Sequence, residues 1–235
     1  MKHYAFDGPF KMRDSEGIEY TLSIFSEDCP EDPRDWTNLC TMVCWHGRYE
    51  LGDRHEFINP SEFLIHLYEE LTGKNWEEDY NTMDWQEIYG AIKETNLVLI
   101  KEINMYEHGG ITVSTSSGYP YNDRWDAGIV GFIYVTKKRV FEECSGITEE
   151  NWLERADRCL EGEMETYDQY VRGDVYGYKL TKKAISKTTC PHCGEVISEN
   201  EVEEDVDGCW GYYGDCLEDN GLLSDLGDLK FIEEV

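Results

Sequence analysis

The sequence predicts an α+β protein with a mainly antiparallel sheet, a long amphipathic helix and a small cysteine-containing hairpin region near the C-terminus. Apolar, β-branched segments separated by Gly and Pro turns predict the strands. One segment carries apolar residues at helical spacing. The order of strands and helices is not an alternating βαβ series, which disfavours a parallel sheet. A chain of 235 residues with 40% hydrophobic content is long enough to bury a substantial core.

The first predicted elements are strands and a capped helix. Residues 18–26 are rich in β-branched and aromatic side chains, and residues 39–49 form a similar segment. A loop is expected over residues 28–35, where two prolines interrupt the chain. Asn59, followed by a proline, predicts a helix start, and Gly73 is suited to the end of that helix.

The middle of the chain predicts a helix followed by a meander. The helix is expected over residues 84–94. Three strands are then predicted over residues 97–105, 110–116 and 129–135. Their connecting turns are expected at Gly109-Gly110 and at Gly118-Tyr119-Pro120.

The clearest helix is predicted over residues 148–171, with Gly173 suited to end it. Its expected core stripe consists of Leu153, Ala156, Leu160, Met164, Tyr167 and Val171. A further strand is predicted over residues 175–180. The composition then becomes strongly acidic, so we expect a core domain of residues 1–187. An acidic C-terminal region, residues 188–235, is expected to pack on it.

Acidic residues dominate the charge of the chain. Fifty Asp and Glu stand against 21 Lys and Arg, which gives a formal net charge of -29 at pH 7. This excess argues against direct binding of nucleic acid, which needs a basic stripe, and favours a partner with a basic surface. The aromatic content of 13% is too high for a disordered acidic tail.

Two further patterns bear on location. No apolar run approaches the roughly 20 residues that span a bilayer, and the first residues lack a signal-peptide core. The nine cysteines are an odd number, which favours free thiols or a metal site over a disulfide framework. We therefore expect a cytoplasmic protein that binds no membrane.

A row of carboxylates follows the predicted 148–171 helix. It consists of Glu150, Glu154, Asp157, Glu161, Glu165 and Asp168. Neighbours in such a row lie about one helical pitch apart, roughly 5.4 Å, which is comparable with the spacing of charges along a duplex. The row is a candidate partner-binding surface that imitates phosphates, and a plain solvated helix face is the alternative.

Four cysteines near the C-terminus form a candidate metal site. Cys190 and Cys193 stand in a Cys-Pro-His-Cys-Gly turn, and Cys209 and Cys216 follow. A CxxC turn lets two thiolates converge on zinc, so one structural zinc is the expected cofactor. Two alternatives stay open, namely reduced thiols on a hairpin and a redox-active CxxC pair.

Polar residues on two strand-like segments form a candidate catalytic set. His46, Asp53, His55 and His108 have the side chains to bind a divalent metal or to share general-base work. Their spacing matches no hydrolase signature, and structural histidines are the alternative.

Three segments interleave glycine with aromatic residues. They are Gly118-Tyr119-Pro120-Tyr121, Tyr176-Gly177-Tyr178 and Cys209-Trp210-Gly211-Tyr212-Tyr213-Gly214. Glycine lets a backbone or ligand approach a stacked ring, so these segments predict a ligand pocket, a partner-binding patch or simply tight turns over a core. A nucleotide-sequestering pocket would need cations beside the rings, for which Arg48, Arg54 and Arg124 are available.

Several segments together resemble an uncharacterised family of proteins encoded by bacteriophages and other mobile elements. The matching segments are Met42–Asp53, His108–Thr112, Trp125–Tyr134, Tyr167–Tyr170, Gly173–Tyr178 and Cys209–Gly214. The chain departs from the pattern at Gly47, where a basic residue is expected, and at Ala127, where Ser is expected. The resemblance implies a phage or mobile-element origin and supplies no activity.

Charge and resemblance together favour a binding function over an enzymatic one. The expected protein is a phage-type acidic inhibitor that mimics nucleic acid. It would occupy a basic surface of a host defence protein or nucleoprotein complex in the infected cell. The alternatives are a metal-dependent enzyme that uses the His and Asp set, and a nucleotide-sequestering module.

Overall fold

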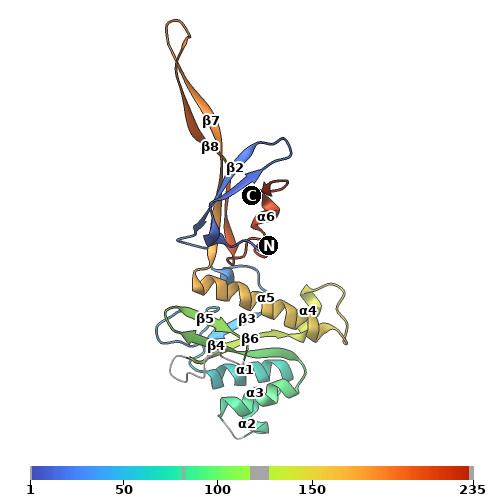
Figure 1. Ribbon diagram of the computed structural model, residues 1–235. Coiled ribbons are helices and arrows are strands. Elements are labelled where there is room, and N and C mark those ends of the chain that lie inside the picture. Colours follow the sequence, from blue (N-terminus) through green and yellow to red (C-terminus); the bar gives the residue numbers. More distant parts are fainter. Residues whose placement is uncertain (1, 81–82, 117–126, 233–235) are drawn as a thin grey trace. The chain divides into compact units, whose positions relative to one another are not determined.

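The computed structural model describes residues 2–80, 83–116 and 127–232. The chain divides into two compact units, which we call unit 1 (Met1–Glu31 with Gly173–Val235) and unit 2 (Asp32–Arg172). Each unit combines helices with an antiparallel sheet, so the predicted α+β class is confirmed (Figure 1).

Unit 2 is a four-stranded sheet with helices on both faces (Figure 1). The strand order is β3-β6-β4-β5, with bounds Thr41–Cys44 (β3), Val98–Glu107 (β4), Ile111–Ser114 (β5) and Ala127–Thr136 (β6). The helices are η2 (Pro33–Asp35), α1 (Pro60–Thr72), α2 (Trp76–Asp79), α3 (Trp85–Glu94), α4 (Lys137–Glu143) and α5 (Trp152–Arg172). One core lies between α5 and the sheet, and a second lies between the other face and α1 with α3.

The helix starts in unit 2 follow the predicted capping residues. The Asn59 side chain accepts a hydrogen bond from the Glu62 amide at the start of α1, and Gly73 ends that helix with φ +69°. Asp84 caps α3 in the same way, by accepting from the Gln86 amide. These two predicted helices are confirmed to within a residue at each end.

The long helix α5 begins four residues later than predicted, because residues before Trp152 form a turn. Trp152 begins the buried stripe, which continues through Ala156, Leu160, Met164 and Tyr167. Leu153 was expected in that stripe but is 46% exposed. It lies about 100° around the helix from Trp152, so only one of the two side chains can face the sheet.

Unit 1 is a five-stranded antiparallel sheet in the order β8-β7-β2-β1-β9. Its elements are η1 (Ala5–Asp7), β1 (Phe10–Arg13), β2 (Glu19–Ser26), β7 (Val175–Thr189), β8 (Val196–Tyr213), α6 (Leu222–Asp225) and β9 (Lys230–Phe231). The two ends of the chain are joined by the β2–β7 ladder, which runs from Tyr20 opposite Lys182 to Ser26 opposite Tyr176. The boundary expected after residue 187 falls inside β7, whereas the two compact units divide after residues 31 and 172.

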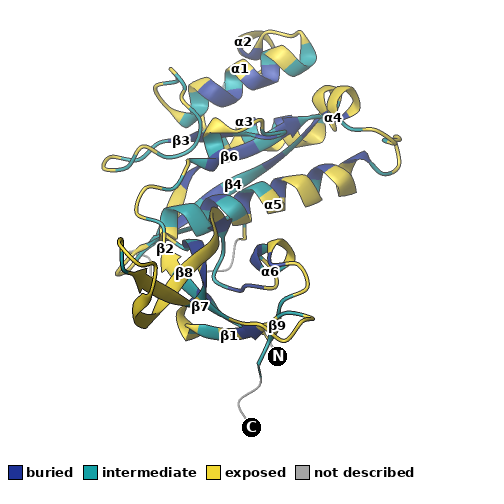
Figure 2. Cartoon of the chain, turned by 90° about the horizontal axis from the view of Figure 1, so that it is seen from above, coloured by how far each residue is buried: buried dark blue, intermediate teal, exposed yellow. Residues whose placement is uncertain are grey.

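The β7–β8 hairpin is much longer than the predicted 175–180 strand. Beyond Lys182, β8 is the one partner of β7 among the residues that the structure describes, and nearly all side chains of this two-stranded part are exposed (Figure 2). Cross-strand ion pairs join Lys183 to Glu201 and Lys187 to Glu199, at 3.0 and 2.7 Å. We call this part, residues 183–203, the distal hairpin.

The expected turn at residues 118–120 lies outside the described residues. Within the described part of the chain, no helix is both long and apolar enough to cross a membrane.

Candidate partner-binding site

Two exposed aromatic rings lie side by side on the sheet of unit 1. Trp210 on β8 is 53% exposed, and Phe25 on β2 is 45% exposed. Their ring centroids are 6.3 Å apart. Gly177 on β7 pairs with Phe25 and lies directly beneath the indole, since a Cβ on Gly177 would be 1.9 Å from the nearest ring carbon. Only glycine leaves room for the ring against the strand.

The rings border a groove of about 590 Å³. It is lined by Phe25, Tyr178, Lys179, Asp205, Val206, Asp207, Gly208 and Trp210, and we call it the Trp210 groove. Asp205 lies 2.9 Å from the Lys179 ammonium, and its side chain is 67% exposed. The Tyr178 hydroxyl donates to Asp207 at 2.8 Å. Burial and the Asp207 carboxylate raise the pKa of Tyr178, so this hydroxyl stays protonated and remains a donor.

This combination of groups is suited to a cationic side chain. Aromatic faces attract Lys and Arg through their quadrupole, and carboxylates pair with the same cations. An ionised carboxylate has about four acceptor positions, so Asp205 and Asp207 keep acceptor capacity beyond their present partners. The surrounding unit carries 22 Asp and Glu against 8 Lys and Arg, and unit 2 carries 28 against 13.

Sequence patterns located part of this groove. Two of the three Gly-aromatic segments, those around Gly177 and Trp210, lie next to each other through the β7–β8 ladder. The third, at residues 118–121, lies outside the described residues. Phe25, Asp205 and Asp207 were not predicted, since their approach depends on strand register.

The cations required by a nucleotide-sequestering pocket are elsewhere. Arg48 and Arg54 belong to unit 2, where Arg48 pairs with Glu107 at 2.9 Å. Arg124 lies outside the described residues. The cation in the Trp210 groove, Lys179, is already paired with Asp205.

The predicted acidic row lies along α5, but most of its carboxylates have partners within unit 2. Asp157 and Glu161 share the Lys101 ammonium, with a distance of 2.6 Å to Glu161. Glu154 pairs with Arg158 at 2.9 Å. Asp168 accepts the Val113 amide at 2.8 Å. The row therefore contributes to folding and is not an array of unpaired charges.

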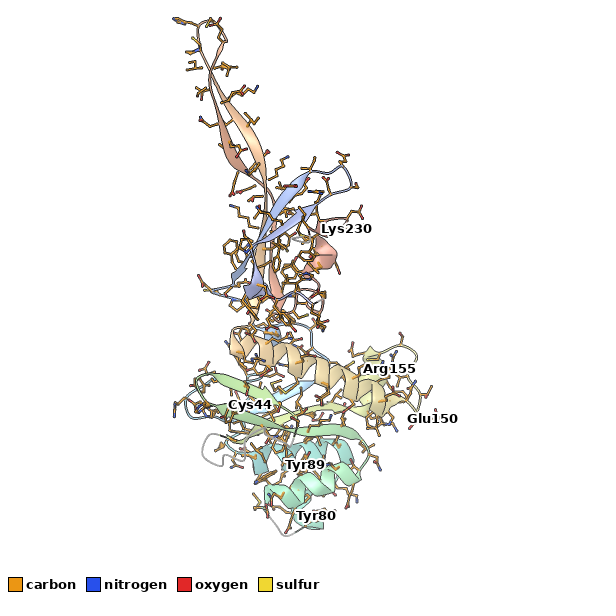
Figure 3. All side chains as sticks on the ribbon, viewed as in Figure 1. Cys44, Tyr80, Tyr89, Glu150, Arg155 and Lys230 are labelled. Atoms are coloured by element: carbon orange, nitrogen blue, oxygen red, sulfur yellow. The ribbon has the colours of Figure 1, made fainter. Side chains whose placement is uncertain are left out.

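The two remaining members differ in position. Glu150 precedes the first turn of α5 (Figure 3), where a hydrogen bond from the Thr148 hydroxyl lowers the pKa of its carboxyl. Glu165 is exposed and forms no ion pair with any residue that the structure describes.

Asp53, one of the four candidate catalytic residues, belongs to a buried ion cluster that the sequence did not reveal. The Arg34 guanidinium, only 4% exposed, donates to both Asp53 oxygens at 2.7 and 3.0 Å and to Glu163 at 3.1 Å. The Met42 amide also donates to Asp53, and the Leu39 amide donates to Glu163. Arg34 and the Met42 amide thus take three of the about four acceptor positions of the Asp53 carboxylate.

The three histidines of that set also have structural partners. His55 contacts the Cys44 carbonyl through Nε2 at 2.8 Å and lies edge-on to Trp45. His46 stacks on Tyr49, and His108 stacks on Tyr106. His46, Asp53 and His55 line one hollow of about 900 Å³, whereas His108 lines a second one with His46. Among the described residues no three potential ligands converge on a metal position.

The CxxC pair of the candidate zinc site lies far in space from Cys209. Cys190 and Cys193 lie in the turn at the tip of the distal hairpin, while Cys209 lies opposite Tyr178 on β8. Thirteen residues of extended strand separate Val196 from Cys209, which is about 40 Å. Cys216 is buried and forms an isolated β-bridge with Tyr4. The structure therefore does not bring these four thiols together, because 2.3 Å Zn–S bonds cannot bridge the distance from the hairpin tip to Cys209.

The comparisons with known proteins add no relative: no protein-family model, no curated protein and no solved structure matches this chain.

Proposed function

We propose that this protein acts by binding a protein partner through the Trp210 groove, and that the partner presents Arg or Lys side chains there. The observation that carries the proposal is the exposed indole held over Gly177 beside Asp205 and Asp207. Tryptophan, once buried by a partner, is among the residues that contribute most to binding energy.

The charge of the chain supports a basic partner. The net charge of -29 is spread over both units, so a basic surface is attracted before any contact forms. In the specific form that we propose, the partner is a host defence protein or nucleoprotein complex whose basic surface handles DNA or RNA. The acidic protein then acts as a phage-type inhibitor that competes with nucleic acid for that surface.

Binding is favoured over catalysis by the state of the candidate catalytic residues. Asp53 is held by Arg34, and His55 contacts a backbone carbonyl through Nε2 while its Nδ1 is buried and has no hydrogen-bond partner among the described residues. A general base or metal ligand needs a free lone pair that points toward substrate or ion. Asp53 accepts from a cation and a backbone amide instead.

A displacement experiment tests the specific form of this proposal. Purified nucleases with basic DNA-binding surfaces are loaded with a fluorescent duplex, and the acidic protein is added at low and at high salt. We expect the protein to displace the duplex from its target at low salt, and Trp210→Ala to do so at least about tenfold less well. Trp36→Ala is the matched control, since Trp36 is a 40% exposed indole in unit 2. Displacement that Trp210→Ala leaves unchanged, or that ignores salt, would contradict the proposal.

A further inference from the structure

The tip of the distal hairpin is built as a two-thiol knuckle. The turn is closed by two backbone hydrogen bonds, from Gly194 to the Cys190 carbonyl at 2.9 Å and from Cys190 to the Glu195 carbonyl at 2.8 Å. Gly194 has φ +76°, which a residue with a side chain rarely adopts. Cys190 and Cys193 are both free thiols.

This arrangement supplies half of a tetrahedral zinc site. Structural zinc takes four ligands, and a CxxC turn supplies two. Within the described residues the tip has no third converging ligand, and the next thiol along the ladder, Cys209, is about 40 Å away. A closed structural site with four protein ligands therefore needs two ligands from another molecule.

We propose that two copies of this chain meet tip to tip and bind one Zn²⁺ between them, with Cys190 and Cys193 of each copy as the four ligands. The four thiols lose their protons to solvent, and the metal is held by four thiolates. The site does not exist in a single copy, so zinc binding and dimer formation are one equilibrium.

The tip is suited to a second copy for electrostatic reasons. Two chains of net charge -29 repel each other over most of their surfaces. Residues 186–198, however, contain one Lys and one Glu, so like charge is lowest at the tip. Among the described residues β7 pairs there with β8 alone, and the side chains of both strands are exposed within unit 1 (Figure 3).

The tip also offers apolar contact area that a single copy leaves uncovered. Val196 is 49% exposed and Ile197 is 65% exposed. Exposed β-branched residues at the end of a strand pair are unfavourable in water, and a second tip would cover them. Charge and apolar surface thus both favour self-association at this end of the hairpin.

The zinc-bridged dimer forms without the proposed partner, but it changes how that partner would bind. A zinc-bridged pair carries two Trp210 grooves. A partner with two basic sites would then gain effective concentration for the second contact.

The full-length chain, purified with zinc, tests the inference by metal analysis and sedimentation. The experiment is done at high salt, which screens self-repulsion and any contact with a basic partner, so it succeeds or fails separately from the proposed function. We expect one zinc per two chains and a dimer, and a chelator should yield metal-free monomers. Substitution by cobalt(II) should give the visible absorption of a tetrahedral four-thiolate site.

Two variants make the test specific. Cys193→Ser should abolish metal, dimer and cobalt absorption together, and circular dichroism confirms that the exposed tip change leaves the fold intact. Cys209→Ser, on the same strand but far from the tip, should change none of them. One zinc per monomer, a zinc-free protein, or a dimer that survives the chelator and dissociates only with a reductant would each overturn the inference.

Discussion

Gly177 leaves the space in which the Trp210 indole lies, and a single added carbon would meet that ring at 1.9 Å. The contact joins β7 to β8, and Phe25 on β2 lies opposite Gly177 in the ladder. The exposed indole therefore packs directly against the strand beneath it as well as beside the Phe25 ring.

Gly177→Ala should displace the indole and alter the Trp210 groove. Because ring and strand cannot both keep their places, we expect a loss of about 1–3 kcal/mol in the free energy of unfolding and weaker partner binding. Urea denaturation measures the first, and near-UV circular dichroism reports the ring. Gly128→Ala is the control, since a Cβ there meets nothing within 4 Å. Equal behaviour of the two variants would show that the close approach has no energetic importance.

Arg34→Ala should strongly destabilise unit 2. It leaves Asp53 and Glu163, 26% and 16% exposed, without their cation. Removing one partner of a buried ion pair costs about 3–5 kcal/mol. Arg158→Ala, which breaks a pair whose side chains are 65% and 73% exposed, should cost less than about 1 kcal/mol. Thermal and urea unfolding of both variants check the contrast, and similar losses would contradict a structural role for the cluster.

Acid should weaken unit 1 through Glu218. Burial raises the pKa of this carboxyl, but hydrogen bonds from the His3 amide and ring, the Glu218 amide and the Cys216 thiol together outweigh burial, so its pKa lies below the usual value. A lowered pKa in the folded state gives stability that is present above the unfolded pKa of about 4.3 and is lost as pH falls through the folded value.

Glu218→Gln should therefore reduce the slope of stability against pH below about pH 4.3. The measurement is urea unfolding at a series of pH values. Glu165→Gln serves as the control because Glu165 is exposed and has no ion pair among the described residues. If the two variants have the same slope, His3 and Glu218 do not stabilise the N-terminal segment.

Local sequence patterns were sufficient to predict where the capped helices α1 and α3 begin. Asn59 and Asp84 start helices because their side chains accept backbone amides within the next turn, which depends on neighbouring residues alone. The strand β8 was missed because its residues 199–207 are mostly acidic, which is unusual for a strand. The signal that could have located it is charge pairing, since β7 lysines lie opposite β8 carboxylates across the Cys-Pro-His-Cys turn.

Which side chains come together at the candidate sites depends on contacts between residues that are distant in sequence. Arg34 lies 19 residues from Asp53 and 129 from Glu163, so no local pattern predicts their cluster. Cys209 follows the CxxC turn at a spacing typical of zinc sites, yet the extended ladder places it opposite Tyr178. Residues a few positions apart are far apart in space when they lie along an extended strand, whereas in a compact loop they stay close.

The most direct test of the account is the affinity of an arginine-rich peptide for the wild-type protein, Trp210→Ala and Trp36→Ala, measured by fluorescence anisotropy at increasing salt. All three proteins have the same net charge, so a general attraction between opposite charges predicts three identical titrations. A binding site at the Trp210 groove predicts that Trp210→Ala alone weakens binding, by at least about tenfold, and that the difference persists at high salt. Equal affinities for the three proteins would contradict the account.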